Sequence, residues 1–264
     1  MSKTQNILFV LEGRDAEKTL VKRLTEVFNF SGTSYTVNGN IYALYQAVKD
    51  DPYVNIVDVL KVMQNSESDK SVLSRVFTDV FLVFDSDLHH TQHPQDAHTL
   101  SQTEIVKRNM KIVVEMVSRF NESTDPSRGK LLINYPMVES FRDCDAFFDE
   151  SYANARVDVR DLARYKNIVG HRRLASRHVK NYTRENFCNL IKMNILKLNQ
   201  IVRGEFTSPT YDVFWEDSSQ DVIARKETES IERHNCIEVL NTLLFLPLDY
   251  FGNKNNLFDE IVNG

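Results

Sequence analysis

The first half of the chain alternates short, wholly apolar runs with amphipathic segments. The apolar runs are Ile7–Leu11, Val80–Phe84 and Leu131–Ile133. Continuous apolar runs of this length are typical of strands that are buried on both faces of a parallel sheet. Apolar residues at helical spacing follow the first run over Asp15–Phe28 and the second run over Gln102–Phe120. This alternation predicts an α/β fold in which a mostly parallel, Rossmann-like sheet is flanked by helices.

Weaker patterns fill the intervals between these elements. Ser34–Val37 predicts a second strand. Ile41–Val48 and Val54–Met63 predict two helices, or one helix that is broken at Asp51-Pro52. The polar, histidine-rich stretch Asp87–His98 predicts a loop.

The pattern changes beyond about residue 145. Apolar residues recur at helical spacing over Val157–Tyr165, Arg184–Ile201 and Asp221–Leu244. Only 8 glycines and 6 prolines occur in 264 residues, which also favours long helices. We therefore predict an α/β unit over residues 1–145 and a mainly helical extension over residues 146–264, which would bind nucleic acid or a partner.

Composition narrows the class of protein. Hydrophobic residues make up 42% of the chain, enough for a real core, and the net charge of −5 argues against a uniformly basic surface while allowing one basic face. The apolar runs are too short for a signal peptide or a membrane span. Three cysteines lie far apart without a CxxC pair, as reduced thiols of a cytoplasmic protein would: Cys144, Cys188 and Cys236.

Carboxylates end two of the predicted strands. Glu12 follows the first apolar run, and Asp85 and Asp87 follow the second. The carboxyl ends of neighbouring parallel strands face one crevice, and both side chains of an Asp-x-Asp on extended backbone point the same way. Hard cations such as Mg²⁺ take a few such oxygen ligands and complete their shell with water and phosphate. These acids therefore predict a site for Mg²⁺ or Mn²⁺, although each acid alone also suits a strand end or a helix start.

The same residues carry a family resemblance. The segment ILFVLEG followed by a helix, and VFLVFDSD about seventy residues later, resemble the TOPRIM domain over roughly residues 5–140. The resemblance implies a TOPRIM-like fold with Glu12, Asp85 and Asp87 as the catalytic, metal-binding acids. Many nuclease branches add an acid four residues after the first glutamate, where this chain has Ala16. Either neighbour could replace that acid: Asp15 or Glu17.

A narrower resemblance involves the segment NYPMVES, which contains Glu139 as a further candidate ligand. It is similar to the small TOPRIM nucleases of bacterial anti-phage systems that are partnered with ABC-type ATPases. This resemblance implies a metal-dependent endonuclease that cleaves RNA, tRNA included, or DNA, and that is kept inactive until triggered. It also implies an ATPase sensor partner; a homodimer is a further candidate assembly, and one-metal and two-metal mechanisms both stay open.

A basic segment between Arg164 and Arg184 is the candidate surface for nucleic acid. Several of its cations recur every three to four residues, which predicts a single helical face, and the flanking Tyr165 and Tyr182 could stack on bases. The residues expected to contact phosphates are Arg172, Arg173, Arg177, Lys180 and Arg184.

Four histidines follow the Asp-x-Asp motif: His89, His90, His93 and His98. They favour a mobile polar loop over a site for a softer metal or a contact with the scissile phosphate, and His90 or His93 is the secondary candidate for such a role.

Other functions remain as alternatives. An Asp-x-Asp motif that holds a nucleotide-sugar through Mn²⁺ would suit a glycosyltransferase, although the Glu12-Gly13 turn and the basic segment do not. A haloacid-dehalogenase-type phosphatase would need its nucleophilic aspartate after the first strand, where Glu12 stands. A non-catalytic TOPRIM-like binding subunit is supported by Ala16.

Overall fold

A computed structural model describes residues 6–13, 15–51, 53–63, 67–92, 96–253 and 256–264. It is an α/β structure with a mostly parallel five-stranded sheet in the order β2-β1-β3-β5-β4. The strands of this sheet are β1 (Ile7–Leu11), β2 (Thr33–Thr36), β3 (Asp79–Asp85), β4 (Asn121–Glu122) and β5 (Gly129–Asn134). Among the described strands of this sheet, only β4 runs antiparallel to its neighbour.

The three apolar runs are strands of this sheet, as predicted, and they form its centre. β1 pairs in parallel with β3, and β3 pairs in parallel with β5. Every residue of β1 is buried, which explains why its sequence shows no polar alternation. The weaker predictions also held: β2 lies at the edge beside β1, one residue earlier than expected.

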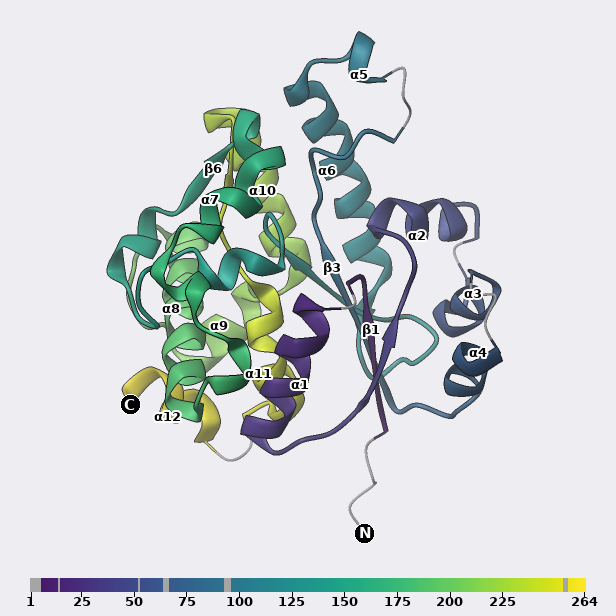
Figure 1. Cartoon of the computed structure of the whole chain (residues 1–264), viewed down its shortest axis with the longest axis horizontal. Helices are drawn as coiled ribbons and strands as arrows, with labels where there is room; N and C mark the ends of the chain where they lie inside the picture. Colours follow the sequence, from purple (N-terminus) through teal and green to yellow (C-terminus); the bar gives the residue numbers. More distant parts are fainter. Residues whose placement is uncertain (1–5, 14, 52, 64–66, 93–95, 254–255) are drawn as a thin grey trace.

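Helices cover both faces of the sheet (Figure 1). One side carries α2 (Ile41–Val48), α3 (Ile56–Met63), α4 (Glu67–Leu73) and α6 (Gln102–Arg119), with the short α5 (Asp96–Thr99) before α6. The other side carries α1 (Ala16–Phe28) together with helices of the second half. These are α7 (Tyr165–Gly170), α8 (Arg184–Arg203), α9 (Tyr211–Asp217), α10 (Gln220–His234), α11 (Leu246–Phe251) and α12 (Leu257–Asn263).

The second half is mainly helical, but two of its predicted helices are wrong in extent. Val157 lies in β6 (Arg156–Asp158), which pairs antiparallel with β7 (Cys236–Glu238). The predicted helix over Asp221–Leu244 is shorter because Asn235 adopts the left-handed conformation that ends α10. The chain then enters β7 and a 3-10 helix.

Short 3-10 helices connect much of this half. They are η1 (Val138–Arg142), η2 (Glu150–Asn154), η3 (Val159–Arg164), η4 (Arg173–Ser176), η5 (Val179–Asn181) and η6 (Thr242–Phe245). The long helix α8 begins at Arg184, as predicted, because Thr183 caps it in a reciprocal pair of hydrogen bonds with Asn186.

One hydrophobic core joins the two halves of the chain. It includes β1, β3 and β5 as well as residues of α8, α10 and η6. Phe30 stacks on Tyr250 with ring centroids 4.6 Å apart, and Tyr135 pairs with Leu240 in an isolated bridge. The residues on either side of position 145 therefore share their core.

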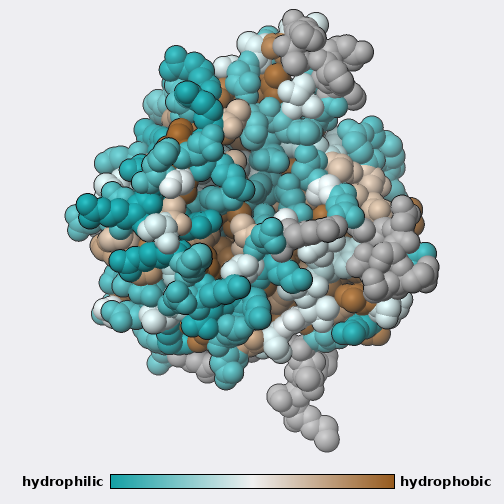
Figure 2. Space-filling view, in the orientation of Figure 1, coloured by the Kyte–Doolittle hydropathy of each residue, from teal (hydrophilic) through white to brown (hydrophobic). Residues whose placement is uncertain are grey.

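The surface seen in Figure 2 is largely hydrophilic, with apolar side chains in scattered spots. Within the described ranges, the structure has no helix of the length and apolarity needed to span a membrane. All three cysteines are free thiols: Cys144 and Cys236 are buried, and Cys188 is half-buried.

Candidate functional site

Glu12 and Asp85 meet at the carboxyl edge of the sheet. Leu11 and Val83 are paired in the β1–β3 register, so the residues that follow them leave the sheet side by side. The backbone amide of Glu12 donates to the Val83 carbonyl at 3.2 Å. In return, Glu12 Oε2 accepts a hydrogen bond from the Asp85 amide at 3.0 Å. The prediction that two strands bring these carboxylates together is confirmed.

Asp85 is fixed from the opposite side by β5 and η1. Its Oδ1 accepts a hydrogen bond of 2.7 Å from the Val138 amide and a longer one of 3.4 Å from Asn134 Nδ2. Asn134 is the register partner of Asp85 on β5. The carboxylate is thus oriented by groups from two neighbouring segments.

Asp87 reaches the same edge, but by a different route from the predicted one. Its φ of 41° is left-handed, so the Asp-x-Asp motif is not extended over its whole length. The Asp87 carbonyl accepts a 2.8 Å hydrogen bond from the His90 amide, which closes a turn. Ser86 between the two acids is buried, and its hydroxyl donates to the Pro136 carbonyl at 2.9 Å.

The structure distinguishes the two acids that flank Ala16. Asp15 is exposed, whereas Glu17 in the first turn of α1 is only 5% exposed. Gly13 permits this arrangement, because a Cβ atom there would lie 2.0 Å from Glu17 Oε2. Of the two, Glu17 is the carboxylate that lies against the Glu12-Gly13 turn.

Glu139 lies at the same edge, and a lysine from the second half of the chain is paired with it. Glu139 is 6% exposed, and its Oε1 forms an ion pair with Lys166 Nζ at 2.6 Å. The acids of the edge raise the pKa of Lys166, chiefly through this hydrogen bond. The sequence offered no signal for Lys166 beyond its membership of the basic segment.

Burial and mutual repulsion make ionisation of these acids costly. Burial, and then the charge of Asp87, raise the pKa of Glu12 to about 8. Burial followed by the charge of Glu12 raises the pKa of Asp85 well above its usual range. The pKa values of Asp87 and Glu17 are also raised, mainly by burial. Carboxylates crowded in this way favour a bound cation.

The described side chains provide oxygen donors but no preformed metal cage. Among the residues that the structure describes, no three His, Cys, Asp or Glu side chains are arranged to hold a metal ion together. The donor set nevertheless suits a hard cation, since it consists of carboxylates. Within the same residues, the hydrogen bonds of Glu12 and Asp85 use one oxygen of each carboxylate, Oε2 and Oδ1.

Two histidines near Asp87 affect the pKa of its carboxyl group. His89 and His90 lower the pKa of Asp87, against the larger effect of burial. The His90 ring stacks on Tyr42 at 5.5 Å between centroids, and Asn109 Nδ2 donates to the His90 carbonyl at 2.8 Å. The first part of the predicted loop is thus held in place. His93 and the His98 side chain lie outside the described residues.

The basic segment does not form the predicted helical face. It is built from η4 and η5 with extended residues between them, so the spacing of its cations does not align them. Arg172 pairs with Asp143 at 2.8 Å, Arg184 pairs with Glu260 at 2.8 Å, and Arg177 lies over the Phe147 ring. The expectation that Tyr165 and Tyr182 stack on bases is wrong, because both are buried.

The five predicted phosphate contacts therefore differ in availability. Three of them are engaged in the protein, as described above. The Arg173 amide donates to Asp145 at 2.9 Å, which fixes its backbone. Lys180 has no ion-pair partner among the described residues and lines a groove along the exposed side of α1.

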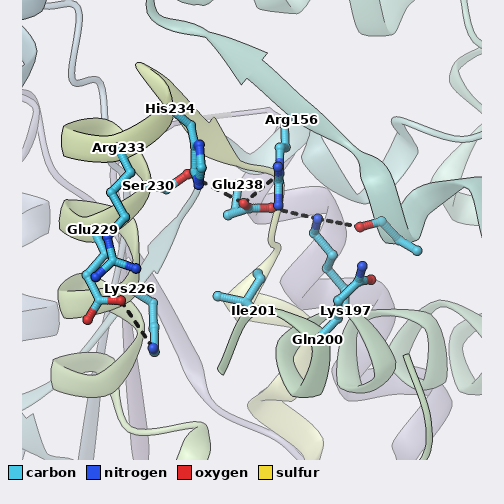
Figure 3. A pocket seen from close by; sticks show the side chains of 11 residues that line it. Arg156, Lys197, Gln200, Ile201, Lys226, Glu229, Ser230, Arg233, His234 and Glu238 are labelled. Atoms are coloured by element: carbon cyan, nitrogen blue, oxygen red, sulfur yellow. Dashed lines mark hydrogen bonds and ion pairs between the residues drawn. The ribbon is translucent and has the colours of Figure 1, made fainter. Parts of the chain in front are cut away.

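A second polar cluster, between α8, α10 and the β6–β7 pair, is shown in Figure 3. Lys197 is 1% exposed and donates to Glu238 Oε2 at 2.8 Å and to the carbonyls of Ala153 and Ala155. Arg156 pairs with the other oxygen of Glu238 at 2.7 Å. Because all three protons of the Lys197 ammonium are used, this cluster joins elements of the fold.

Comparison of the chain with protein-family models, curated proteins and solved structures finds no match in any of the three.

Proposed function

We propose that this protein is a divalent-metal-dependent endonuclease of TOPRIM-like type that cleaves RNA, tRNA included, or DNA. The observation that carries the proposal is the hydrogen bond between Glu12 Oε2 and the Asp85 amide. It places two carboxylates from neighbouring parallel strands at one edge, with Asp87 close enough to raise the pKa of Glu12. Such a concentration of oxygen donors suits Mg²⁺ or Mn²⁺.

In this proposal Glu12, Asp85 and Asp87 hold the cation, and Glu17 and Glu139 are the further ligands. The bound cation would supply charge stabilisation to a phosphodiester and its attacking and leaving oxygens. The protein's own part is orientation: the amides of Asp85 and Val138 fix one oxygen each of Glu12 and Asp85. Lys166 places a positive charge at the same edge, where it can attract a phosphate.

The biological role follows from the resemblance of the sequence and belongs to the same proposal. The nuclease would act as an effector of anti-phage defence in the cytoplasm, held inactive by an ABC-type ATPase partner until triggered. An acidic site that needs a cation before it can bind phosphate is compatible with such control.

The experiment compares the wild-type protein with Glu12→Gln and with a matched control, Glu232→Gln, which changes an exposed glutamate of α10. Each protein is incubated with tRNA, single-stranded RNA and plasmid DNA in Mg²⁺, in Mn²⁺ and in EDTA. We expect cleavage that requires metal, survives in Glu232→Gln and is lost in Glu12→Gln. The substrate that is cut identifies the class of nucleic acid.

Metal binding provides a second readout that does not depend on an activating partner. We expect Mn²⁺ to raise the Tm of the wild-type protein and of Glu232→Gln, and to leave that of Glu12→Gln unchanged. Cleavage that persists in Glu12→Gln, or an equal Mn²⁺ effect on all three Tm values, would overturn the proposal.

A further inference from the structure

A basic groove runs along the exposed side of α1. It has a volume of about 390 Å³ and is lined from two elements, α1 and η5. We call it the α1–η5 groove; its lining residues are Lys18, Thr19, Lys22, Arg23, Glu26 and Lys180.

The groove starts beside the acidic edge of the sheet. Glu17, in the first turn of α1, is one of the carboxylates described above, and Lys18 is the next residue. Lys22 follows one helical turn later, on the same face as Lys18. At a rise of about 1.5 Å per residue, Lys18 and Lys22 lie within roughly 8 Å of Glu17 along the helix axis. The first lining residue of the groove is therefore adjacent to Glu17 along α1.

The charges in the groove are predominantly positive and only partly paired. Four cations face one acid, Glu26, in a chain whose net charge is −5. Glu26 pairs with Arg23 at 3.1 Å and more loosely with Lys22 at 3.9 Å. In the described part of the chain, Lys18 and Lys180 form no ion pair. The side chain of Lys22 is 74% exposed.

Arg23 connects the two walls of the groove. Its Nε donates to the Tyr182 carbonyl at 3.0 Å, which ties α1 to the segment that carries Lys180. Tyr182 itself is buried against Phe187 and Phe147. The two walls are thus held together by a buried anchor, and the lysines at the rim are left facing solvent.

We propose that the α1–η5 groove binds the sugar-phosphate backbone of the nucleic acid substrate where it enters or leaves the carboxylate edge. This inference rests on the proposed function and assigns the substrate path of that same site. Lysine ammonium groups act as point charges on phosphates, so the groove binds without regard to base sequence. In this proposal the groove provides the phosphate contacts in place of Arg172, Arg177 and Arg184, whose side chains make contacts within the protein. Of the predicted phosphate contacts, Lys180 is kept.

The test uses the double variant Lys18→Gln/Lys22→Gln in the full chain. Its control is Lys107→Gln/Lys111→Gln, two lysines with the same four-residue spacing on α6. Binding of fluorescein-labelled single-stranded RNA and of the matching DNA is measured by anisotropy in EDTA, at salt concentrations from about 50 to 200 mM. Glu12→Gln is measured in parallel.

Each lost phosphate contact reduces the magnitude of the negative slope of log affinity against log salt by about 0.7–0.9. We expect the magnitude of the slope to be about 1.5 smaller for the groove variant, and unchanged for the control pair. Adding Lys180→Gln, which removes one further contact, should reduce the magnitude of the slope by about 0.7–0.9 more. If only RNA, or only DNA, binds with this change in salt slope, the result identifies which nucleic acid the groove binds.

The outcomes separate this inference from the proposed function. Equal slopes for the groove variant and the wild-type protein, or no binding of either nucleic acid, overturn the groove. Metal-dependent cleavage can still be lost in Glu12→Gln under those outcomes. A reduced slope combined with cleavage that survives in Glu12→Gln would keep the groove as a binding surface and remove the catalytic assignment.

Discussion

At the scale of single residues, the cost of ionising Glu12 gives a measurable pH dependence. Glu12 keeps its proton in the folded protein up to a pKa of about 8, well above the usual glutamate pKa of 4.5. Between these values the folded state binds more protons than the unfolded state, so the free energy of unfolding falls as pH rises. We expect urea denaturation between pH 5 and 8 to show a loss on the order of a few kcal/mol.

Substitution and metal provide the controls for that pH dependence. Glu12→Gln should flatten the slope, because a neutral amide cannot ionise, whereas Glu232→Gln should keep it. Mg²⁺ at pH 8 should restore part of the lost stability in the wild-type protein only. A slope that is equal in Glu12→Gln and wild type would show that Glu12 is not the group concerned.

Asp85 combines a structural hydrogen bond with a proposed catalytic charge, and two substitutions separate these roles. In Asp85→Asn the remaining carbonyl oxygen can still accept from the Val138 amide, so we expect little change in Tm and loss of cleavage. Asp85→Ala leaves that amide without an acceptor, which costs about 1–3 kcal/mol. Thermal unfolding and cleavage assays on both variants check this. A large loss of Tm in Asp85→Asn would make the residue structural.

The backbone of Gly13 lies close to the carboxylate of Glu17. In Gly13→Ala the new Cβ would meet Glu17 Oε2 at 2.0 Å, so the flexible Glu17 side chain must turn away. We expect at least a several-fold weaker Mn²⁺ affinity with nearly unchanged stability, measured by titration and by thermal unfolding. Gly170→Ala is the control, because its added Cβ would meet no atom within 4 Å beyond its chain neighbours and the backbone of its own helix. Equal Mn²⁺ affinity in both variants would show that Glu17 is not a ligand.

At the scale of elements, the sequence predicted the sheet and its acids because a strand that is buried on both faces has a continuous apolar sequence. β1, β3 and β5 appear in the sequence as apolar runs, and carboxylates follow two of them. The predicted helical face of the basic segment was wrong because tertiary contacts, and not the spacing of its residues, determine its backbone. Its cations repeat at helical spacing, but burial of Leu174 and Tyr182 and the cap at Thr183 break the backbone into η4, η5 and the start of α8. These contacts are tertiary and leave no periodic signal.

The junction between α10 and β5 provides a test at this scale. Gln220, at the start of α10, is 4% exposed, and its Oε1 accepts the Ile133 amide at 3.1 Å. Gln220→Met keeps the volume of the side chain but removes the acceptor. We expect a loss of about 1–3 kcal/mol in the free energy of unfolding. Gln46→Met, at an exposed position of α2, should change it little. Equal stability of the two variants would mean that Ile133 finds another acceptor.

At the scale of the whole molecule, the site itself spans the two halves. The acids come from residues before position 145, whereas Lys166, which pairs with Glu139, comes from α7. β5 also depends on the second half: Thr242 donates to the Ile133 carbonyl at 2.8 Å, and Tyr135 and Leu240 exchange two hydrogen bonds of 2.9 Å. Composition changes near residue 145, but the sequence contains no information on this shared packing.

We therefore expect the full chain to unfold in one cooperative transition and the fragment 1–145 not to fold alone. The fragment would expose the face of the sheet that α8, α10 and η6 cover, together with unpaired backbone groups of β5. Circular dichroism during thermal unfolding measures cooperativity, and adding fragment 146–264 in trans provides the control. Recovery of a cooperative transition and of Mn²⁺ binding on mixing would show that the second half completes the fold. A cooperative transition in fragment 1–145 alone would restore the two-unit organisation that the sequence predicts.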